Sequence, residues 1–457
     1  MFGLETNLGI LFIASIIAAC VFEFVNGFHD TANAVATVIY TRSLKPYQAV
    51  IWSGFCNFLG VMFGGIGVAM GIIKLLPLID MANAGIHEGI ALLLGMIVSA
   101  IIWNLFTWKL GLPCSSSHTM IGSIIGVGLM FSYFHSNGDG IDWTKAIEIG
   151  ASLLVSPLFG FASAIVLMFL GRQFLKGNKS KRDVIFNIPS PNSVPPTWIR
   201  IILFITCTSV SFFHGSNDGQ KGVGLVLIIL MTFFPLQYAL NSNFSPDELS
   251  KSIINIERIS KLEGIDNVYQ EIDISKKSIY EFTLLNNTLN KLKLRKNLIA
   301  LTKSLGEELK LGKKFINTES KSILKVEIEN LKKNFEFVPF WVILMISLSL
   351  GIGTTIGWKR IVVTIGEKIG KSHLTYAEGA AAEIVAAITI GLSSGFGLPV
   401  STTHILSSGI AGAMTATKGV KNLQANTIKN IVIAWVLTMP VCMILSASLY
   451  WIFRIFI

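Results

Sequence analysis

Two short polar strings occur twice in this chain, each time within sequence that is apolar enough to lie in a lipid bilayer. The first pair is Gly27-Phe-His-Asp30-Thr-Ala-Asn33 and Gly215-Ser-Asn-Asp218-Gly-Gln-Lys221. The second pair is Gly111-Leu-Pro-Cys-Ser-Ser-Ser-His118 and Gly397-Leu-Pro-Val-Ser-Thr-Thr-His404. An ionisable side chain at membrane depth is costly, so its presence indicates a functional site. The duplication predicts one site built from two related halves.

The first pair of strings supplies carboxylates. Asp30 and Asn33 are three residues apart and would share one face of a helix. Asn217 lies beside Asp218 in the second half, and the oxygens of either pair suit a hard cation or a proton. Alternatively, these residues could form hydrogen bonds that hold neighbouring helices together. Burying an aspartate for that purpose costs more free energy than burying Asn or Ser. Lys221, which matches Asn33, could contact an anion or neutralise Asp218.

The second pair of strings predicts an anion site. Pro113 and Pro399 each follow Gly-Leu and precede hydroxyl residues and a histidine. Proline suits the first turn of a helix and Ser or Thr its cap, so each string indicates a helix that begins within the membrane. Free N–H groups and the positive dipole end there suit a tetrahedral oxyanion such as phosphate or sulfate. Hydroxyl donors would come from Ser115, Ser116, Ser117, Ser401, Thr402 and Thr403. Back-bonding within ordinary packed helices is the alternative.

His118 and His404 end the second pair of strings. Each could shuttle protons or hold the start of its helix. The sequence has no GxxxxGK[ST] nucleotide-binding motif, which disfavours ATP-driven transport by this chain alone. A coupled ion would therefore supply the energy.

The composition is that of a membrane protein. The chain has 457 residues, of which 52% are hydrophobic and 14% charged, whereas a soluble domain carries about 25% charged residues. Apolar runs long enough to span a bilayer recur, which predicts an all-α polytopic fold with about 10–12 transmembrane segments. Several runs, including 198–213 and 222–240, abut the polar strings and are interpreted as half-helices. The net charge of +10 indicates cytoplasmic Lys and Arg rather than nucleic-acid binding.

The spacing of the strings defines the organisation of the chain. Asp218 lies 188 residues after Asp30, and His404 lies 286 residues after His118. The two offsets differ by 98 residues, close to the 97 residues of segment 241–337. Without that segment both pairs share one offset, so the chain is predicted to be two copies of one unit with an insert in the second.

We therefore expect a first transmembrane repeat at 1–170, a basic, proline-rich linker at 171–197, and a second transmembrane repeat at 198–240 and 338–457. Segment 241–337 is rich in Lys, Glu, Asn and Ser and is expected to be a small soluble helical insert. Alternatively, a Lys-rich helical face of this segment could lie on the membrane surface or bind a partner. Its apolar residues recur at helical spacing: Leu249, Ile253, Ile256, Ile259 and Leu262.

The distribution of Lys and Arg predicts sidedness. The linker 171–197 is basic and therefore cytoplasmic, whereas residues 1–7 carry no Lys or Arg. The two repeats thus begin with different Lys and Arg content, which places their first residues on opposite sides of the membrane. This predicts an inverted repeat, in which broken helices form the site. The basic stretch 359–371 would also be cytoplasmic, and the single span 338–357 separates it from the insert. The insert is therefore expected to be extracytoplasmic.

The motifs resemble those of the inorganic phosphate transporter (PiT) family, whose halves carry G-x-x-D-x-x-N-type and P-x-S-[ST]-[ST]-H signatures. With the long insert, they look like the bacterial low-affinity Pit branch over essentially the whole chain. The matching segments are Asn26-Gly-Phe-His-Asp-Thr-Ala-Asn-Ala, His214-Gly-Ser-Asn-Asp-Gly-Gln-Lys-Gly, Ile365-Gly-Glu-Lys-Ile-Gly and Leu398-Pro-Val-Ser-Thr-Thr-His.

The resemblance implies secondary active uptake of inorganic phosphate across a bacterial inner membrane. Members of the Pit branch are proton-coupled and are thought to carry phosphate as a neutral complex with a divalent metal, whereas other members of the family use sodium. Many sodium-coupled members have Glu at the position matched to Asn57, which favours proton coupling here. Lys221 departs from the D-x-x-N form and puts a symmetric cation arrangement in doubt.

The combined interpretation is a proton-driven phosphate symporter that lies in the lipid bilayer. It is expected to need no bound cofactor and could form a homodimer. Phosphate is expected at the six hydroxyl residues named above, with Asn33, Asn217 and Lys221. The proton or ion is expected at Asp30 and Asp218, with His118 and His404. The alternatives are a sodium-coupled phosphate or sulfate carrier, an anion channel, and an intramembrane hydrolase with Ser116 as nucleophile.

Overall fold

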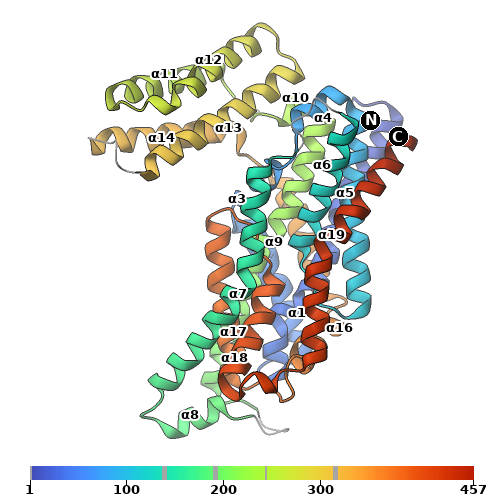
Figure 1. Cartoon of the computed structure of the whole chain (residues 1–457), viewed down its shortest axis with the longest axis vertical. Coiled ribbons are helices and arrows are strands. Elements are labelled where there is room, and N and C mark those ends of the chain that lie inside the picture. Colours follow the sequence, from blue (N-terminus) through green and yellow to red (C-terminus); the bar gives the residue numbers. More distant parts are fainter. Residues whose placement is uncertain (1–2, 136–140, 189–193, 242–243, 312–316) are drawn as a thin grey trace. The chain divides into compact units, whose positions relative to one another are not determined.

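The computed structural model describes residues 3–135, 141–188, 194–241, 244–311 and 317–457, which form helices joined by turns and include no β-strand (Figure 1). The predicted all-α class is confirmed. Contacts divide the chain into two compact units. The first comprises Met1–Pro77, Ile90–Val226 and Phe340–Ile457, and the second comprises Leu78–Gly89 and Leu227–Pro339.

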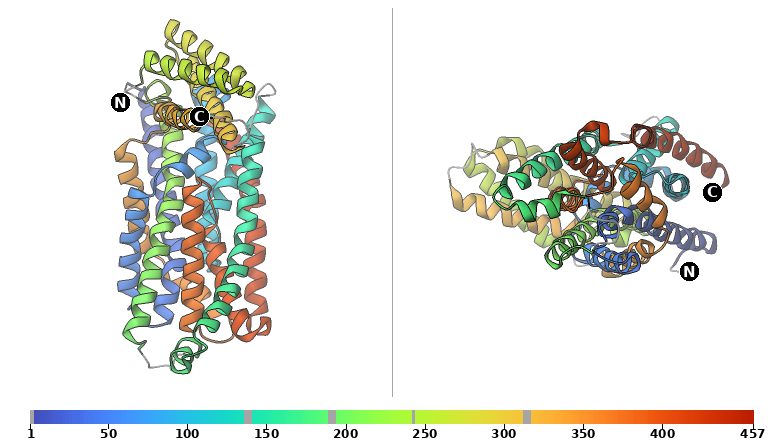
Figure 2. Two further views of the ribbon diagram at one scale, coloured as in Figure 1. Left: turned by 90° about the vertical axis from the view of Figure 1, so that its left-hand side faces the viewer. Right: turned by 90° about the horizontal axis from the view of Figure 1, so that it is seen from below.

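The first unit is built mainly of long apolar helices that run side by side (Figure 2). Its helices are α1 (Thr6–Tyr40), α2 (Pro46–Phe63), α3 (Gly67–Ile73), α5 (Ile86–Leu110), α6 (Ser116–Phe134), α7 (Trp143–Phe174), α8 (Lys179–Phe186), α9 (Thr197–Phe233), α15 (Phe340–Thr355), α16 (Lys359–Val363), α17 (Tyr376–Gly395), α18 (Thr402–Lys418) and α19 (Ala425–Phe456). The first residues of α5 and the last of α9 belong to the second unit.

Fewer helices qualify as membrane spans than the 10–12 expected. Among the described residues, seven are long and apolar enough, or nine if each of two bent helix pairs is one span. Helix α18 has 17 residues and α15 has 16, whereas a helix that crosses the bilayer has about 20, and α15 counts only as part of a bent pair.

The first pair of polar strings does not break a helix. Helices α1 and α9 have 35 and 37 residues and run through Asp30 and Asp218 without interruption. The interpretation of 198–213 and 222–240 as half-helices is therefore wrong. The glycines of these strings are packing positions: a Cβ at Gly215 would lie 2.2 Å from the carbonyl oxygen of Asn57 on α2.

The second pair of strings does end one helix and begin another. Helix α5 ends at Leu110 and α17 at Gly395, and the next turn in each case contains a glycine with a φ of +68°, Gly111 or Gly397. That left-handed conformation is strained for any residue with a Cβ. Each chain then continues as an extended segment into α6 or α18, as the sequence predicts.

In each predicted repeat, one helix packs along a helix of the other repeat. Helix α6, from the first repeat, packs along α19, and the matching α18 packs along α7. Helix α15 packs against both α1 and α2. The starts of α6 and α18 also contact α1 and α9, through hydrogen bonds to Asp30 and Asp218. Whether the repeats have inverted topology stays a prediction.

The second unit is a helical bundle of α4 (Leu78–Ala84), α10 (Pro235–Tyr238), α11 (Pro246–Glu263), α12 (Tyr269–Leu284), α13 (Thr288–Leu311) and α14 (Thr318–Phe335). The helical pattern read from the sequence forms its core, since Leu249, Ile253, Ile256 and Ile259 are buried. Leu262 is 73% exposed, because α11 ends one residue later and turns at Gly264, whose φ is +65°.

A buried arginine joins the two ends of this bundle. Arg295 on α13 donates from Nη1 to the carbonyl oxygens of Ala239, at 2.8 Å, and Phe335, at 2.7 Å. The backbone N–H of Asn241 also donates to the carbonyl oxygen of Asn334, at 2.8 Å. Burial lowers the pKa of Arg295 to about 10, so the side chain remains charged at neutral pH. The charged side chain of Arg295 thus holds the first and last residues of this unit's main segment together.

Candidate functional site

The two helix starts at the centre of the first unit are capped in the same way. Ser115 Oγ accepts a hydrogen bond from the backbone N–H of His118, at 3.2 Å, and Ser401 Oγ accepts one from that of His404, at 3.1 Å. Both serines are N-caps and are buried. Their hydroxyl groups are therefore occupied in holding the helix starts.

The two prolines precede the helices instead of occupying their first turns. Each lies two residues before its cap, so the expectation of a first-turn proline is wrong. The carbonyl oxygen of Pro113 accepts from Trp435 Nε1 at 3.2 Å, and that of Pro399 accepts from Ser152 Oγ at 3.1 Å. The prolines thus fix the extended segments against α19 and α7.

Asp30 and Asp218 meet at a single hydroxyl group. Ser116 Oγ lies 3.1 Å from Oδ2 of Asp30 and 3.1 Å from Oδ2 of Asp218. Both carboxylates are almost completely buried. A serine hydroxyl has one proton to donate, so it can satisfy only one of the two carboxylates at a time.

The start of the second half-helix contacts both carboxylates as well. Thr403 Oγ1 donates to Oδ1 of Asp30, and Thr402 Oγ1 donates to Oδ2 of Asp218 at 3.4 Å. Oδ1 of Asp218 is buried and has no hydrogen-bond partner. One carboxylate oxygen in the centre of the site is thus available to a proton or a cation.

Lys221 is fully buried and completes the cluster. Its Nζ lies 2.9 Å from Oδ2 of Asp218 and 2.8 Å from the hydroxyl oxygens of both Ser116 and Ser117. Of the two roles that the sequence left open for Lys221, the neutralisation of Asp218 is the one the geometry shows. The lysine also holds the start of α6 against α9.

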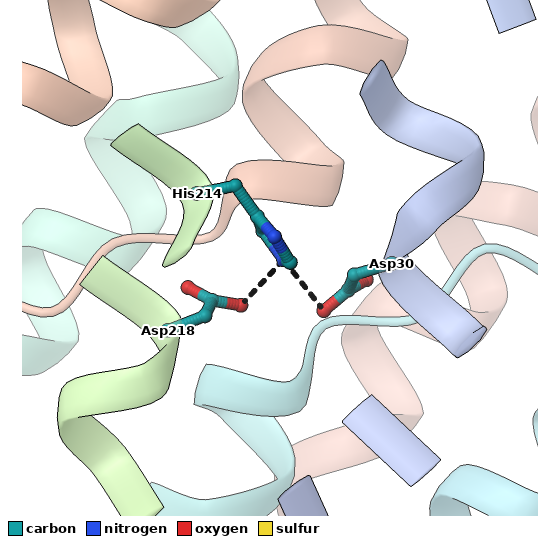
Figure 3. A group of neighbouring side chains, drawn as sticks. All are labelled: Asp30, His214 and Asp218. Carbon is teal, nitrogen blue, oxygen red and sulfur yellow. Dashed lines mark ion pairs between the residues drawn. The ribbon is translucent and has the colours of Figure 1, made fainter. Parts of the chain in front are cut away.

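His214 joins this cluster, although the sequence analysis did not single it out. Its Nε2 lies 3.4 Å from Oδ2 of Asp218 and 3.9 Å from Oδ2 of Asp30, and Figure 3 shows the imidazole between the two carboxylates. Its Nδ1 lies 3.0 Å from Oδ1 of Asn57. The residue precedes Asp218 by four positions, which places both on one helical face. That spacing is visible in the sequence and could have identified it.

One ligand atom from each of Asp30, His214 and Asp218 lies within 4.8 Å of the others. Carboxylate oxygens with an imidazole nitrogen form a donor set that suits transition metals better than sodium, which prefers oxygen ligands. The three residues could therefore hold a divalent metal ion.

The other candidate residues surround this centre. Asn217 holds the extended segment before α18, since its Nδ2 donates to the carbonyl oxygen of Leu398 at 3.1 Å and its Oδ1 accepts from the N–H of Val400 at 3.2 Å. The His118 and His404 rings pack together with their centroids 4.5 Å apart, and His404 stacks on Trp435. The side chain of Asn33 lies outside the described residues.

Buried glutamates near the site, among them Glu383 and Glu23, were not predicted from the sequence. Glu383 on α17 accepts hydrogen bonds from the hydroxyl groups of Thr37 on α1 and Thr206 on α9, so it joins three helices. Glu23 lies on α1 and is fully buried. Neither belongs to a repeated string, so the duplication that revealed the aspartates gives no indication of them.

Comparison with known proteins gives a consistent result. Residues 26–446 match the model of a family described as the phosphate transporter family. The chain is 38% identical to the low-affinity inorganic phosphate transporters PitB and PitA of Escherichia coli (strain K12), with 98% of each chain covered. It is 28% identical to the probable low-affinity inorganic phosphate transporter of Bacillus subtilis (strain 168), covering 97% of each.

The fold is similar to that of a solved structure described as the sodium-dependent phosphate transporter. The TM-score is 0.59 with 21% sequence identity, and the match covers 98% of this chain and 100% of the other. At that identity the likeness concerns the fold alone.

Proposed function

Because this chain belongs to the phosphate transporter family, we propose that it imports inorganic phosphate by symport with protons across a bacterial inner membrane. The chain is a multi-pass membrane protein and a transporter, not an enzyme. The observation that carries the proposal is the meeting of two helix starts, α6 and α18, with two buried aspartates.

The helix starts supply the anion-binding half of the mechanism. Backbone N–H groups at the N-termini of α6 and α18 and the hydroxyl groups of Ser116, Thr402 and Thr403 are donors suited to phosphate oxygens. In the described state these hydroxyl groups donate to Asp30 and Asp218 instead. An anion can take them over only when the carboxylates no longer need them.

The carboxylates supply the coupling. Two ionised aspartates repel a phosphate anion, and a proton on one of them lowers this repulsion and removes that carboxylate's demand for a hydroxyl donor. Proton binding and phosphate binding therefore favour each other, which is what symport requires. Rocking of one repeat against the other would then expose the loaded site to the opposite side.

A divalent metal can take the place of protons as the neutralising charge. The unpartnered Oδ1 of Asp218 and the neighbouring Nε2 of His214 support binding of phosphate as a metal complex. In this form the metal is part of the substrate. The donor set favours this version over sodium coupling, which remains the alternative.

The test is phosphate uptake into proteoliposomes. With an inward proton gradient and divalent metal, wild-type protein should accumulate phosphate, and an inward sodium gradient alone should not drive uptake. Asp30→Asn should lower the uptake rate more than about tenfold, since a loss of 1.4 kcal/mol is already tenfold. Asp183→Asn, which changes an exposed aspartate on α8, is the control. Sodium-driven accumulation, or wild-type uptake by Asp30→Asn, would refute the proposal.

A further inference from the structure

Glu23 is a fully buried carboxylate on α1 that the mechanism above does not use. Its Oε2 accepts a hydrogen bond from Nδ2 of Asn26, at 3.2 Å, while its Oε1 is buried with no hydrogen-bond partner. Oδ1 of Asn26 also lacks a partner. An ionised carboxylate in such a place costs far more than a protonated one, because a buried charge needs several donors or a counter-ion.

The position of Glu23 ties it to the site. Glu23, Asn26 and Asp30 follow at spacings of three and four residues, which places them along one face of α1. This row of polar groups leads from Glu23 to the carboxylate that shares Ser116 with Asp218. It forms a polar strip along one face of a mostly apolar helix.

The side chain of Glu23 also lies directly against α9. A Cβ at Gly222 would lie 2.2 Å from Cγ and 2.7 Å from Oε1 of Glu23, so only glycine leaves space for the glutamate. Gly222 follows Lys221, the lysine that neutralises Asp218. The glutamate is thus packed beside the charged part of the cluster.

The charged and titratable groups around Glu23 are few. Lys221 and Asp218 on α9 and the thiol of Cys20 on α1 interact with it electrostatically. Helix α15, which packs against the same part of α1, carries no titratable side chain. A charge on Glu23 is therefore felt mainly by the ion pair in the site.

The repeat shows that Glu23 has no counterpart. At the offset of 188 residues, its equivalent is Ser211 and the equivalent of Asn26 is His214. In the second half the polar residue one turn before the aspartate contacts that aspartate, whereas in the first half it contacts Glu23. Symmetric substrate binding does not require this carboxylate, and its presence needs a separate reason.

We propose that Glu23 is a second protonation site of the transport cycle, which takes up the coupling proton on Oε1 and releases it when the site opens to the other side. The step forms an O–H bond at Oε1 as a hydronium ion becomes water, and the reverse occurs on release. Loss of the negative charge beside Lys221 strengthens the attraction of that lysine for an incoming anion. The inference rests on the proposed proton-coupled uptake.

The test separates proton-driven accumulation from exchange. In proteoliposomes, Glu23→Gln mimics the protonated side chain permanently, so it should lower proton-driven net uptake at least about tenfold. Exchange of internal for external phosphate at equal pH requires no net proton movement and should stay within about threefold of wild type. Glu23→Asp keeps a carboxylic acid and should recover part of the net uptake.

Glu148→Gln, which changes an exposed glutamate on α7, is the matched control and should leave both activities unchanged. Net uptake by Glu23→Gln within about twofold of wild type would overturn the proposal, as would equal loss of net uptake and exchange, which indicates a structural role. Failure of the wild type itself to accumulate phosphate under a proton gradient would instead refute the proposed function.

Discussion

The ion pair between Lys221 and Asp218 allows a quantitative test of how the site is held together. Its Nζ–Oδ2 distance is 2.9 Å, and both side chains are buried. At an effective dielectric constant of about 20, two unit charges at this distance attract each other by about 6 kcal/mol. Desolvation of both groups offsets most of that attraction, so the pair as a whole adds little to stability.

Removing one partner has a different cost from removing both. Lys221→Met leaves Asp218 charged with only His214, Ser116 and Thr402 nearby, and should lower the free energy of unfolding by about 3–5 kcal/mol. Asp218→Asn leaves Lys221 with two hydroxyl acceptors and should cost a similar amount. The double variant removes both charges and should cost much less than the sum.

The measurement is reversible unfolding in mixed micelles, applied to the wild type, both single variants and the double variant. Because the double variant should be more stable than either single variant, we expect a coupling energy that exceeds the cost of each single variant, that is, more than about 3 kcal/mol. Additive effects, with a coupling energy under about 0.5 kcal/mol, would show that the two side chains do not stabilise each other and would refute the reasoning.

Two further predictions concern packing and the second unit. Gly215→Ala should destabilise the protein by about 1–3 kcal/mol and impair uptake, because its Cβ would meet the backbone of Asn57. Gly150→Ala is the control and should leave stability unchanged, because the space beside Gly150 is open. Thermal unfolding measures the stability of both variants. Arg295→Met should lower the stability of the second unit by about 1–3 kcal/mol, since two buried carbonyl groups lose their donor. Limited proteolysis measures this loss, and Arg258→Met, on the surface of α11, is the control.

Some of the fold could be predicted because its cause is local. The helix starts at Ser116 and Thr402 follow from a glycine that permits a left-handed turn and a serine that caps the next helix. The core of α11 follows from apolar residues at helical spacing. In both cases the residues within one or two turns determine the structure.

Other features depend on contacts between distant segments. The glycines near Asp218 resemble a helix break in the sequence, but α9 continues because those glycines face α2 and the polar side chains find partners on α6 and α18. The roles of His214 and Glu23 likewise depend on which way each side chain points. The sidedness of 241–337 stays a prediction from charge.

The charges at the centre of the site show why an anion cannot bind there alone. Asp30 and Asp218 contribute two negative charges and Lys221 one positive charge, which leaves a net negative charge beside the helix starts. The matched residue in the first half, Asn33, is neutral, so the repeat supplies no second lysine. If phosphate binds here as proposed, it requires positive charge from outside the chain, either as protons on the carboxylates or His214 or as a metal ion. In the proposed mechanism, the asymmetry between Asn33 and Lys221 makes phosphate binding depend on the coupling ion, whereas a second lysine would offset the remaining negative charge.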